Sequence, residues 1–287
     1  MEVQWVRLGA EEILVASSRG AWIQQPELGA LGLVGPMPDS LPATYETTRH
    51  LLDGAIAAAE RAAPRVQVPP MTARRWAWHL ASQWHCAHHS VALLDELIER
   101  YDATERPDLA EFAHRKLEEE QGHDQFPLAD LRALGYDAEA LIQALPPPPG
   151  VAAGLDYARD CVRREHPVDF LGYVYALERR VLRFSEDWFA ALEAVLPPGV
   201  EAASGLRAHA SEFDVEHVGE AISFFAGLSA DDRTRIAIGC YRTTQISCAA
   251  FPGQHPSEAE LDCWLSPVQR ARVPAGGSSG RKQGESS

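Results

Sequence analysis

The sequence lacks a long apolar run, and no stretch approaches the roughly 20 apolar residues that a helix needs to cross a bilayer. Its first residues also lack the basic and then apolar plan of a secretory signal peptide. We therefore expect a cytoplasmic protein that has no membrane partner.

Cysteine is scarce and scattered. The chain has five cysteines, and none of them forms a CxxC or CxxxC pair with another. An odd, dispersed set fits reduced thiols in a core better than a disulfide framework or a zinc knuckle.

Positively charged residues are also few: the chain has 26 Lys and Arg against 41 Asp and Glu, and its formal net charge is -15 at pH 7. Such a surface offers nothing that would attract nucleic acid phosphates without regard to sequence, so we expect no nucleic acid partner. What the chain does have is 287 residues, 46% of them hydrophobic and 23% charged, which is the balance of a globular protein with a substantial core.

The N-terminal region differs from the rest of the chain. Short β-branched and aromatic runs at 3–8, 13–16 and 21–23 alternate with turns that contain Gly and Ser, which predicts a small β meander or hairpin. Three prolines within 35–42 disfavour both helix and strand and predict a linker. We expect a β-rich extension over 1–40, which either offers a strand edge to a partner or caps the core.

Everything after this extension is expected to be helical, in one domain over 41–273. The Gly- and Ser-rich tail 274–287 is predicted to be disordered. Proline-rich segments separate the predicted helices, which lie at about 43–63, 72–101, 108–134, 151–165, 168–195, 201–226, 230–250 and 257–271.

A carboxylate and an imidazole share one face of the predicted helix 108–134. Glu120 and His123 are three residues apart, which places them about 60° from one another around the helix axis. Leu117 and Leu128 lie on or near the same face, so we expect the pair to point toward the core.

Two further acidic positions have the same character. Asp214 and His217 repeat the acid-x-x-His spacing on a helix face rich in Leu, Ala and Phe, and Glu178 falls in line with an apolar stripe on the helix between them. Because burying such groups without partners would be costly, each should have a partner in the fold.

A single acid-x-x-His pair is more often a surface contact than a metal site. Three inward sites on three helices are typical of a non-haem diiron centre instead, because carboxylates tolerate both Fe(II) and Fe(III) and imidazoles hold iron without thiolates.

A sixth ligand is expected on the predicted helix 72–101. Counting steps of about 100° per residue puts His88 beside Trp84 and Val91, on the apolar stripe of this helix, with Asp95 as the alternative. The remaining histidines near the two predicted ligand clusters are expected to serve as surface, neighbouring or structural residues: His79, His85, His89 and His209.

Four phrases of the sequence resemble the haem-oxygenase-like diiron oxidases and oxygenases. They are Glu-Glu-Gln-Gly-His-Asp at 119–124, Leu-Ala-Asp-Leu-Arg-Ala-Leu-Gly at 128–135, Gly-Tyr-Val-Tyr-Ala-Leu-Glu at 172–178 and Asp-Val-Glu-His at 214–217. The resemblance covers roughly 72–250 and implies an all-α fold, a haem-oxygenase-like bundle of about seven core helices.

The resemblance also implies a site. Carried over position by position, it makes iron ligands of Glu120, His123, Glu178, Asp214 and His217, with two Fe(II) per chain and O2 as co-substrate.

The chain departs from the family pattern in two places. Many members have Glu on the first core helix, where this chain has His88 nearest the expected place, and some have a further His where this chain has Ala210. Tyr175, one turn before Glu178, is expected either to bond a ligand carboxylate, to be oxidised, or to be a core tyrosine.

The activity that the resemblance implies is O2-dependent oxidation of a small organic substrate, such as an amino acid or a related metabolite, in a biosynthetic pathway. N-oxygenation, desaturation and oxidative C–C cleavage are the outcomes to consider, and a homodimer or an external electron donor would be compatible with each of them. The alternatives are a ferritin-like iron-binding protein, a metal-free thiaminase-like or quinone-forming enzyme of the same fold, and a helical scaffold or sensor.

Overall fold

Helices make up most of the computed structural model, which describes residues 3–9, 12–25, 43–210 and 212–269. The predicted linker at 35–42 and the predicted tail at 274–287 lie outside the described residues. The side chains of 212–214 are also outside the described set, although their backbone is helical.

The predicted N-terminal strands form one antiparallel sheet of three strands, in the order β1-β2-β3. β1 spans Val3–Arg7, β2 spans Ile13–Ser17 and β3 spans Gly20–Gln24. The tight turn between the last two strands ends at Gly20, whose φ of 146° disfavours other residues. The sheet prediction is therefore confirmed.

The remaining elements are helices, and Ser, Thr or Asp side chains cap several of their first turns. They are α1 (Tyr45–Ala62), α2 (Ala73–Ala103), α3 (Pro107–Glu120), α4 (Gln125–Ala133), α5 (Ala138–Ala144), α6 (Pro149–Arg163), α7 (Asp169–Val181), α8 (Glu186–Glu193), α9 (Ser204–His209), α10 (Glu212–Gly227), α11 (Ala230–Ser247), α12 (Glu258–Leu265) and the short 3-10 helix η1 (Ser266–Val268).

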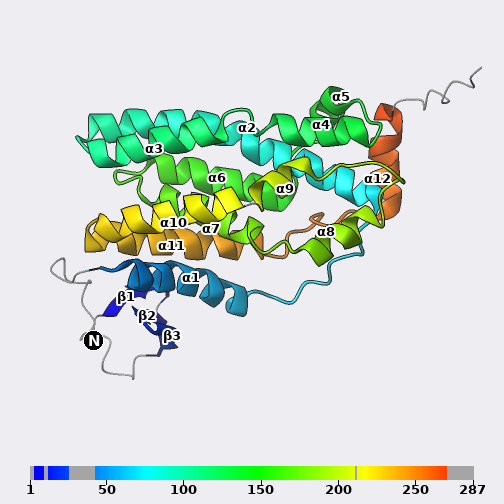
Figure 1. Cartoon of the computed structure of the whole chain (residues 1–287). Coiled ribbons are helices and arrows are strands. Elements are labelled where there is room, and N and C mark those ends of the chain that lie inside the picture. Colours follow the sequence, from blue (N-terminus) through cyan, green and yellow to red (C-terminus); the bar gives the residue numbers. More distant parts are fainter. Residues whose placement is uncertain (1–2, 10–11, 26–42, 211, 270–287) are drawn as a thin grey trace, which may run out of the picture.

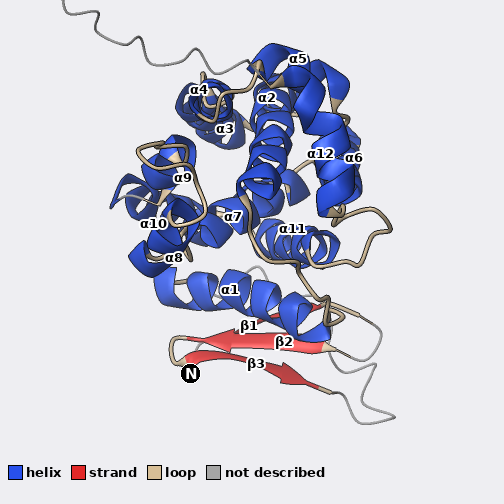
Figure 2. Ribbon diagram, turned by 90° about the vertical axis from the view of Figure 1, so that its right-hand side faces the viewer, coloured by secondary structure: helices blue, strands red, loops and turns tan. Residues whose placement is uncertain are grey.

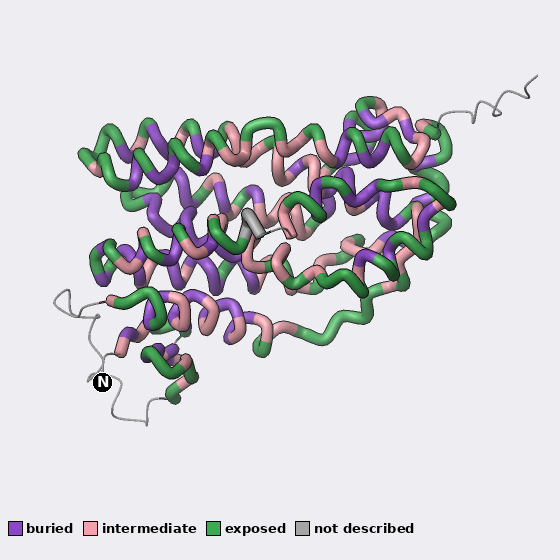
Figure 3. The backbone as a smooth tube through the Cα atoms, viewed as in Figure 1, coloured by how far each residue is buried: buried purple, intermediate pink, exposed green. Residues whose placement is uncertain are grey.

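The helices assemble into a bundle in which α2, of 31 residues, runs along most of the length (Figure 1). α2 packs against α3, α4, α6 and α12, while α11 packs against α1 and α7. Buried segments lie on the turns that face other helices, and exposed segments lie on the outer turns (Figure 3). None of the helices described is long and apolar enough to cross a membrane.

The sheet lies mainly against α1 (Figure 2), and β1 also contacts α11. A buried polar link fastens the sheet at its first strand. The Gln4 side chain donates to Thr47 Oγ1 at 2.8 Å and accepts from Arg233 Nε at 2.9 Å. The sheet is thereby tied both to α1 and to α11.

α7 and α11 approach each other closely. A Cβ added at Gly172 would overlap the carbonyl oxygen of Ile236 and lie 2.7 Å from Cys240 N, and one added at Gly239 would overlap the carbonyl oxygen of Asp169. Glycine at both positions is what allows these two backbones to touch.

Three predicted helices are each broken in two. The predicted helix 108–134 ends at Glu120, because Gly122 has a φ of 83° and turns the chain before α4 begins. The predicted helix 168–195 breaks before Ser185, which caps α8 by accepting from Trp188 N, and the predicted helix 201–226 breaks between α9 and α10.

α5 lies in a stretch with no predicted helix; Asp137 caps its first turn.

The apolar interior divides into two cores. The first joins the sheet, α1, α3, α6, α7, α10, α11 and the C-terminal half of α2, and the second joins α4, α5, α8, α9, α12 and the N-terminal half of α2. α7 reaches both cores, because Val174 packs against the first and Val181 against the second.

Candidate functional site

The candidate site lies at the junction of the two cores. Glu178 lies on α7 between Leu177, which packs on the first core, and Val181, which packs on the second. Glu120 ends α3 between Leu117 of the first core and Leu128 of the second. Charged side chains therefore lie at the boundary between the two apolar cores.

A buried lysine is at the centre of the site. Lys116, on α3, has only 4% of its side chain exposed, and its Nζ lies 2.7 Å from Glu119 Oε2 and 3.0 Å from Glu178 Oε1. Burial disfavours the ammonium form, but the two carboxylates outweigh burial and raise the pKa of Lys116. The lysine is thus held charged between α3 and α7.

Glu178 is only partly satisfied by this contact. Burial raises the pKa of its carboxyl group, and Lys116 opposes the rise without cancelling it. Its second oxygen, Oε2, is buried and has no hydrogen-bond partner in the described part of the chain. One carboxylate oxygen is therefore open to a further ligand.

Glu120 and His123 remain together even though the helix ends between them. The turn at Gly122 brings His123 Nδ1 to 3.3 Å from Glu120 Oε2, a distance suited to an ion pair. Burial raises the pKa of Glu120, but His123, His209 and Lys116 together outweigh it, and the net shift is downward. His123 Nδ1 is buried and makes no hydrogen bond within the described residues.

Two more imidazoles complete the cluster. His217, on α10, has its Nδ1 3.6 Å from Glu119 Oε2, and the ring of His209, at the end of α9, lies edge-on to the ring of His123 with centroids 4.5 Å apart. Asp214 lies one turn before His217 on α10, but its side chain is outside the described set.

The predicted ligands therefore converge from three directions. Glu120 and His123, from α3 and its following turn, contact each other, whereas Glu178 of α7 contacts Lys116 and His217 of α10 lies near Glu119. Among the described residues, no three His, Cys, Asp or Glu side chains are placed to hold a metal ion as they stand.

The donor types nevertheless fit iron. Carboxylates and imidazoles are the ligands of non-haem iron sites. Two atoms of this cluster, Glu178 Oε2 and His123 Nδ1, are buried without hydrogen bonds among the described residues, and they are one of each type.

The inward position that we expected for His88 is wrong. Its side chain is 51% exposed, its ring stacks on Trp84 with centroids 4.4 Å apart, and its Nδ1 lies 2.9 Å from Asp124 Oδ2. The helical-wheel count placed it beside Trp84 correctly, but Trp84 itself lies at the margin of the second core. Asp95, the alternative, is exposed.

Tyr175 does not bond a predicted iron ligand. Its buried hydroxyl donates to Asp53 Oδ1 at 2.8 Å, and Arg179 binds both oxygens of the same carboxylate at 2.8 and 2.9 Å. Burial and the neighbouring Asp53 raise the pKa of Tyr175. The contact joins α7 to α1, as a core tyrosine would.

The other histidines of α2 are more engaged than we expected. His85 is buried and its Nε2 bonds the carbonyl oxygen of Leu145 at 3.0 Å, while His89 Nδ1 bonds the carbonyl oxygen of His85 at 2.7 Å. His79 lies beside the rings of Trp76 and Trp78. Backbone and ring contacts therefore occupy these side chains.

Sequence reasoning missed Lys116 and Glu119. Lys116 precedes Glu120 by one helical turn and so shares its inward face, which is the signal that could have identified it. A lysine that faces a predicted acidic cluster supplies the partner that those acids need.

Comparison with known proteins yields a fold. No family model matches the chain, and no curated protein matches it in sequence. A solved structure from Shewanella denitrificans, of a domain of unknown function with a haem oxygenase-like fold, aligns with 70% of this chain and 83% of that one, with a TM-score of 0.51 and 17% sequence identity. At that identity the likeness extends to the fold alone, and this chain is therefore a haem-oxygenase-like helical bundle with a small N-terminal sheet.

Proposed function

We propose that the protein is a non-haem iron enzyme that uses O2 to oxidise a small organic substrate. One observation carries the proposal: carboxylates and imidazoles from separate helices meet in the interior, and Glu178 Oε2 and His123 Nδ1 are buried there without hydrogen bonds. Buried polar atoms usually have partners, so an exception of this kind calls for a ligand.

Glu120, His123, Glu178 and His217 would hold the iron, with Asp214 proposed from its place on α10. Bound Fe(II), two ions per chain in the expected form, would supply electrons for the reduction of O2. An amino acid or a related metabolite is the proposed substrate, and N-oxygenation, desaturation or C–C cleavage the proposed outcome.

The chain's own residues have definite tasks in this proposal. Lys116 holds Glu119 and Glu178 in place and balances their charge while no metal is bound. The two apolar cores on either side of the cluster bury Lys116 almost completely, which strengthens its interactions with Glu119 and Glu178, whereas the outer side of the cluster at His217 remains 32% exposed.

The test is iron stoichiometry. We would load the protein with Fe(II) without oxygen, count iron per chain, and follow the absorption spectrum after mixing with O2, for the wild type, Glu178→Ala and Glu118→Ala. Glu118 is an exposed residue on α3 and serves as the matched control. Bound iron and an O2-dependent spectral change, both lost only in Glu178→Ala, would support the proposal, and a wild type that binds no iron would reject it.

One observation favours a second candidate, a metal-free enzyme of the same fold. Lys116 compensates Glu119 and Glu178 from within the chain, so these acids do not require a metal ion to be stable. Absence of iron binding in the wild type, with a folded and thermally stable chain, would move this candidate to first place.

A further inference from the structure

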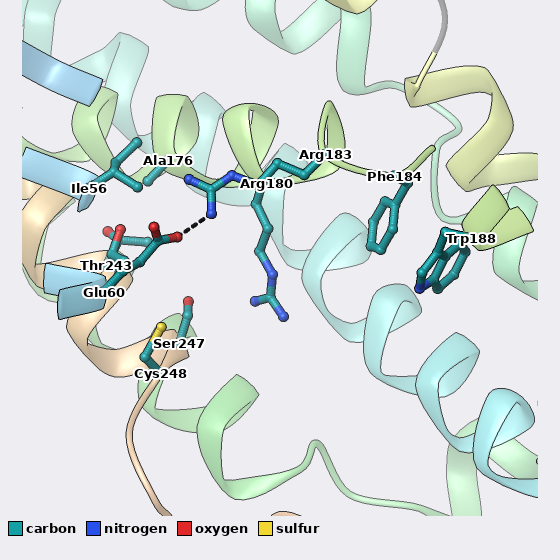
Figure 4. A pocket seen from close by; sticks show the side chains of 11 residues that line it. Ile56, Glu60, Ala176, Arg180, Arg183, Phe184, Trp188, Thr243, Ser247 and Cys248 are labelled. Atoms are coloured by element: carbon teal, nitrogen blue, oxygen red, sulfur yellow. Dashed lines mark hydrogen bonds and ion pairs between the residues drawn. The ribbon is translucent and has the colours of Figure 1, made fainter. Parts of the chain in front are cut away.

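A second pocket lies across α7 from the acidic cluster. Residues two apart on a helix lie about 160° from one another, so Arg180 projects from the face of α7 opposite Glu178. The pocket has a volume of about 340 Å³, which is enough for a small organic molecule. Figure 4 shows Arg180 among side chains of α1, α7 and α11, with two aromatic rings to one side.

Arg180 carries an uncompensated charge. Its side chain is exposed to the pocket and has no ion pair or hydrogen bond in the described part of the chain, whereas its neighbour Arg183 is paired with Glu60 (Figure 4). The pocket lining therefore has a net positive charge, although the chain as a whole has a net charge of -15. An anion is the ligand that such a lining attracts.

The positive charge of Arg180 also acts on neighbouring groups. Burial lowers the pKa of His79 to about 4, and Arg180 adds to that shift. Burial raises the pKa of Cys86 to about 11, and Arg180 opposes that rise. Both effects are those of a nearby positive charge.

Thr243 lines the α11 side of the pocket and lies beside Glu60 (Figure 4). Thr243, which lines the pocket, is 3% exposed, and its Oγ1 is buried without a hydrogen-bond partner among the residues described. The next residue, Thr244, donates to the carbonyl oxygen of Cys240 in the usual way of a helical threonine. Thr243 is thus the one of the two whose hydroxyl is left for a ligand.

The rest of the lining is apolar. The rings of Phe184 and Trp188 lie with their centroids 4.3 Å apart, and Ile56 and Ala176 contribute aliphatic surface. An apolar wall next to a cation and a hydroxyl suits a molecule that has one charged end and a ring or a branched chain at the other.

We propose that this pocket binds a small organic carboxylate. The guanidinium of Arg180 pairs with the carboxylate, and the apolar body lies against Phe184 and Trp188. The proposal does not depend on iron, because α7 separates the pocket from the acidic cluster.

The test measures binding of 3-phenylpropanoate, 3-phenylpropanamide and inorganic phosphate to the full chain by calorimetry, with a chelator present so that no metal contributes. We expect the carboxylate to bind the wild type and the neutral amide to bind at least about tenfold more weakly. Phosphate that binds as tightly as 3-phenylpropanoate would overturn the proposed apolar half of the site.

Variants locate the site. Arg180→Gln should weaken binding of the carboxylate by at least about tenfold. The double variant Glu60→Gln with Arg183→Gln keeps the net charge of the pocket and is the matched control, with an expected change below about threefold. Circular dichroism spectra would show that each variant is folded, and binding that survives Arg180→Gln unchanged would overturn the proposal.

Discussion

At the scale of single residues, the site is organised around a lysine that the predicted ligands did not include. A buried ammonium group with two carboxylates can be stable, but removal of one partner leaves charge in the interior without compensation. Lys116 therefore accounts for how Glu119 and Glu178 are tolerated where the two cores meet.

Replacement of Lys116 should be costly. We expect Lys116→Met to lower the free energy of unfolding by about 3 kcal/mol, because Glu119 and Glu178 lose their shared cation. Urea unfolding of the metal-free protein measures this change. Arg115→Met is the control, since Arg115 makes an exposed pair with Glu111 and its loss should cost less than about 1 kcal/mol.

His79 should make stability depend on pH. Its pKa falls from 6.5 to about 4 through burial first and then through Arg180 and Arg75, so between these values the folded state binds fewer protons than the unfolded state. Stability should therefore be complete above pH 6.5 and decline, by at most about 3 kcal/mol, as the pH falls toward 4.

His79→Gln isolates this effect because glutamine does not titrate. Urea midpoints measured from pH 4 to pH 7 should be flatter for the variant than for the wild type. Equal slopes for the two proteins would show that His79 does not contribute.

The sequence could predict which side chains share one face of a helix, but not which side chains of different helices contact each other. The helices that carry Glu120, Glu178 and His217 meet, and Glu178 contacts Lys116 while His217 lies near Glu119. The prediction that His88 points inward failed, because periodicity gives only the direction of a side chain on its own helix. Whether that side chain is buried depends on which other helices pack against that face.

At the scale of elements, the close contact between α7 and α11 explains why residue 172 is a glycine. Gly172 opens the phrase that ends at Glu178, and its lack of a side chain lets α11 approach. The position of Glu178 relative to Lys116 depends on how α7 is seated, so this packing contact also sets the geometry of the site.

A methyl group should disrupt that contact. Gly172→Ala is expected to destabilise the protein by about 3 kcal/mol, because the added Cβ overlaps backbone atoms of α11 that cannot move alone. Gly154→Ala on α6 is the matched control: nothing lies within 4 Å of an added Cβ there. It should be neutral or stabilise by up to about 1 kcal/mol, since alanine favours a helix. Thermal and urea unfolding of both variants measure these changes in stability, and equal stabilities for the two variants would contradict the prediction.

The order of the helices could be predicted, and their interruptions could not. Amphipathic spacing and proline-rich breaks locate most of the helices, because both act locally. The turn at Gly122 is different: glycine tolerates a helix interior as well as a left-handed turn, and only packing of α4 against α2 selects the turn.

At the scale of the whole molecule, the N-terminal sheet is fastened to the bundle by polar contacts as well as apolar ones. The buried Gln4 bridges Thr47 on α1 and Arg233 on α11. Buried hydrogen bonds of this kind specify one arrangement of the sheet, because any shift would leave their partners unsatisfied.

Removal of this bridge should loosen the sheet. Gln4→Ala is expected to lower the free energy of unfolding by about 2 kcal/mol, whereas Gln24→Ala on the exposed part of β3 should change it by less than about 0.5 kcal/mol. Amide hydrogen exchange in β1 and β2 should accelerate only in the first variant. Equal protection in both variants would mean that apolar packing alone holds the sheet.

α2 has a consequence for how the molecule unfolds. Its first turns contribute to one core and its last turns to the other, over about 46 Å of uninterrupted helix. Neither core can come apart without fraying a helix on which the other depends. The cooperative unit should therefore be the entire bundle, and heating should produce one calorimetric peak rather than two.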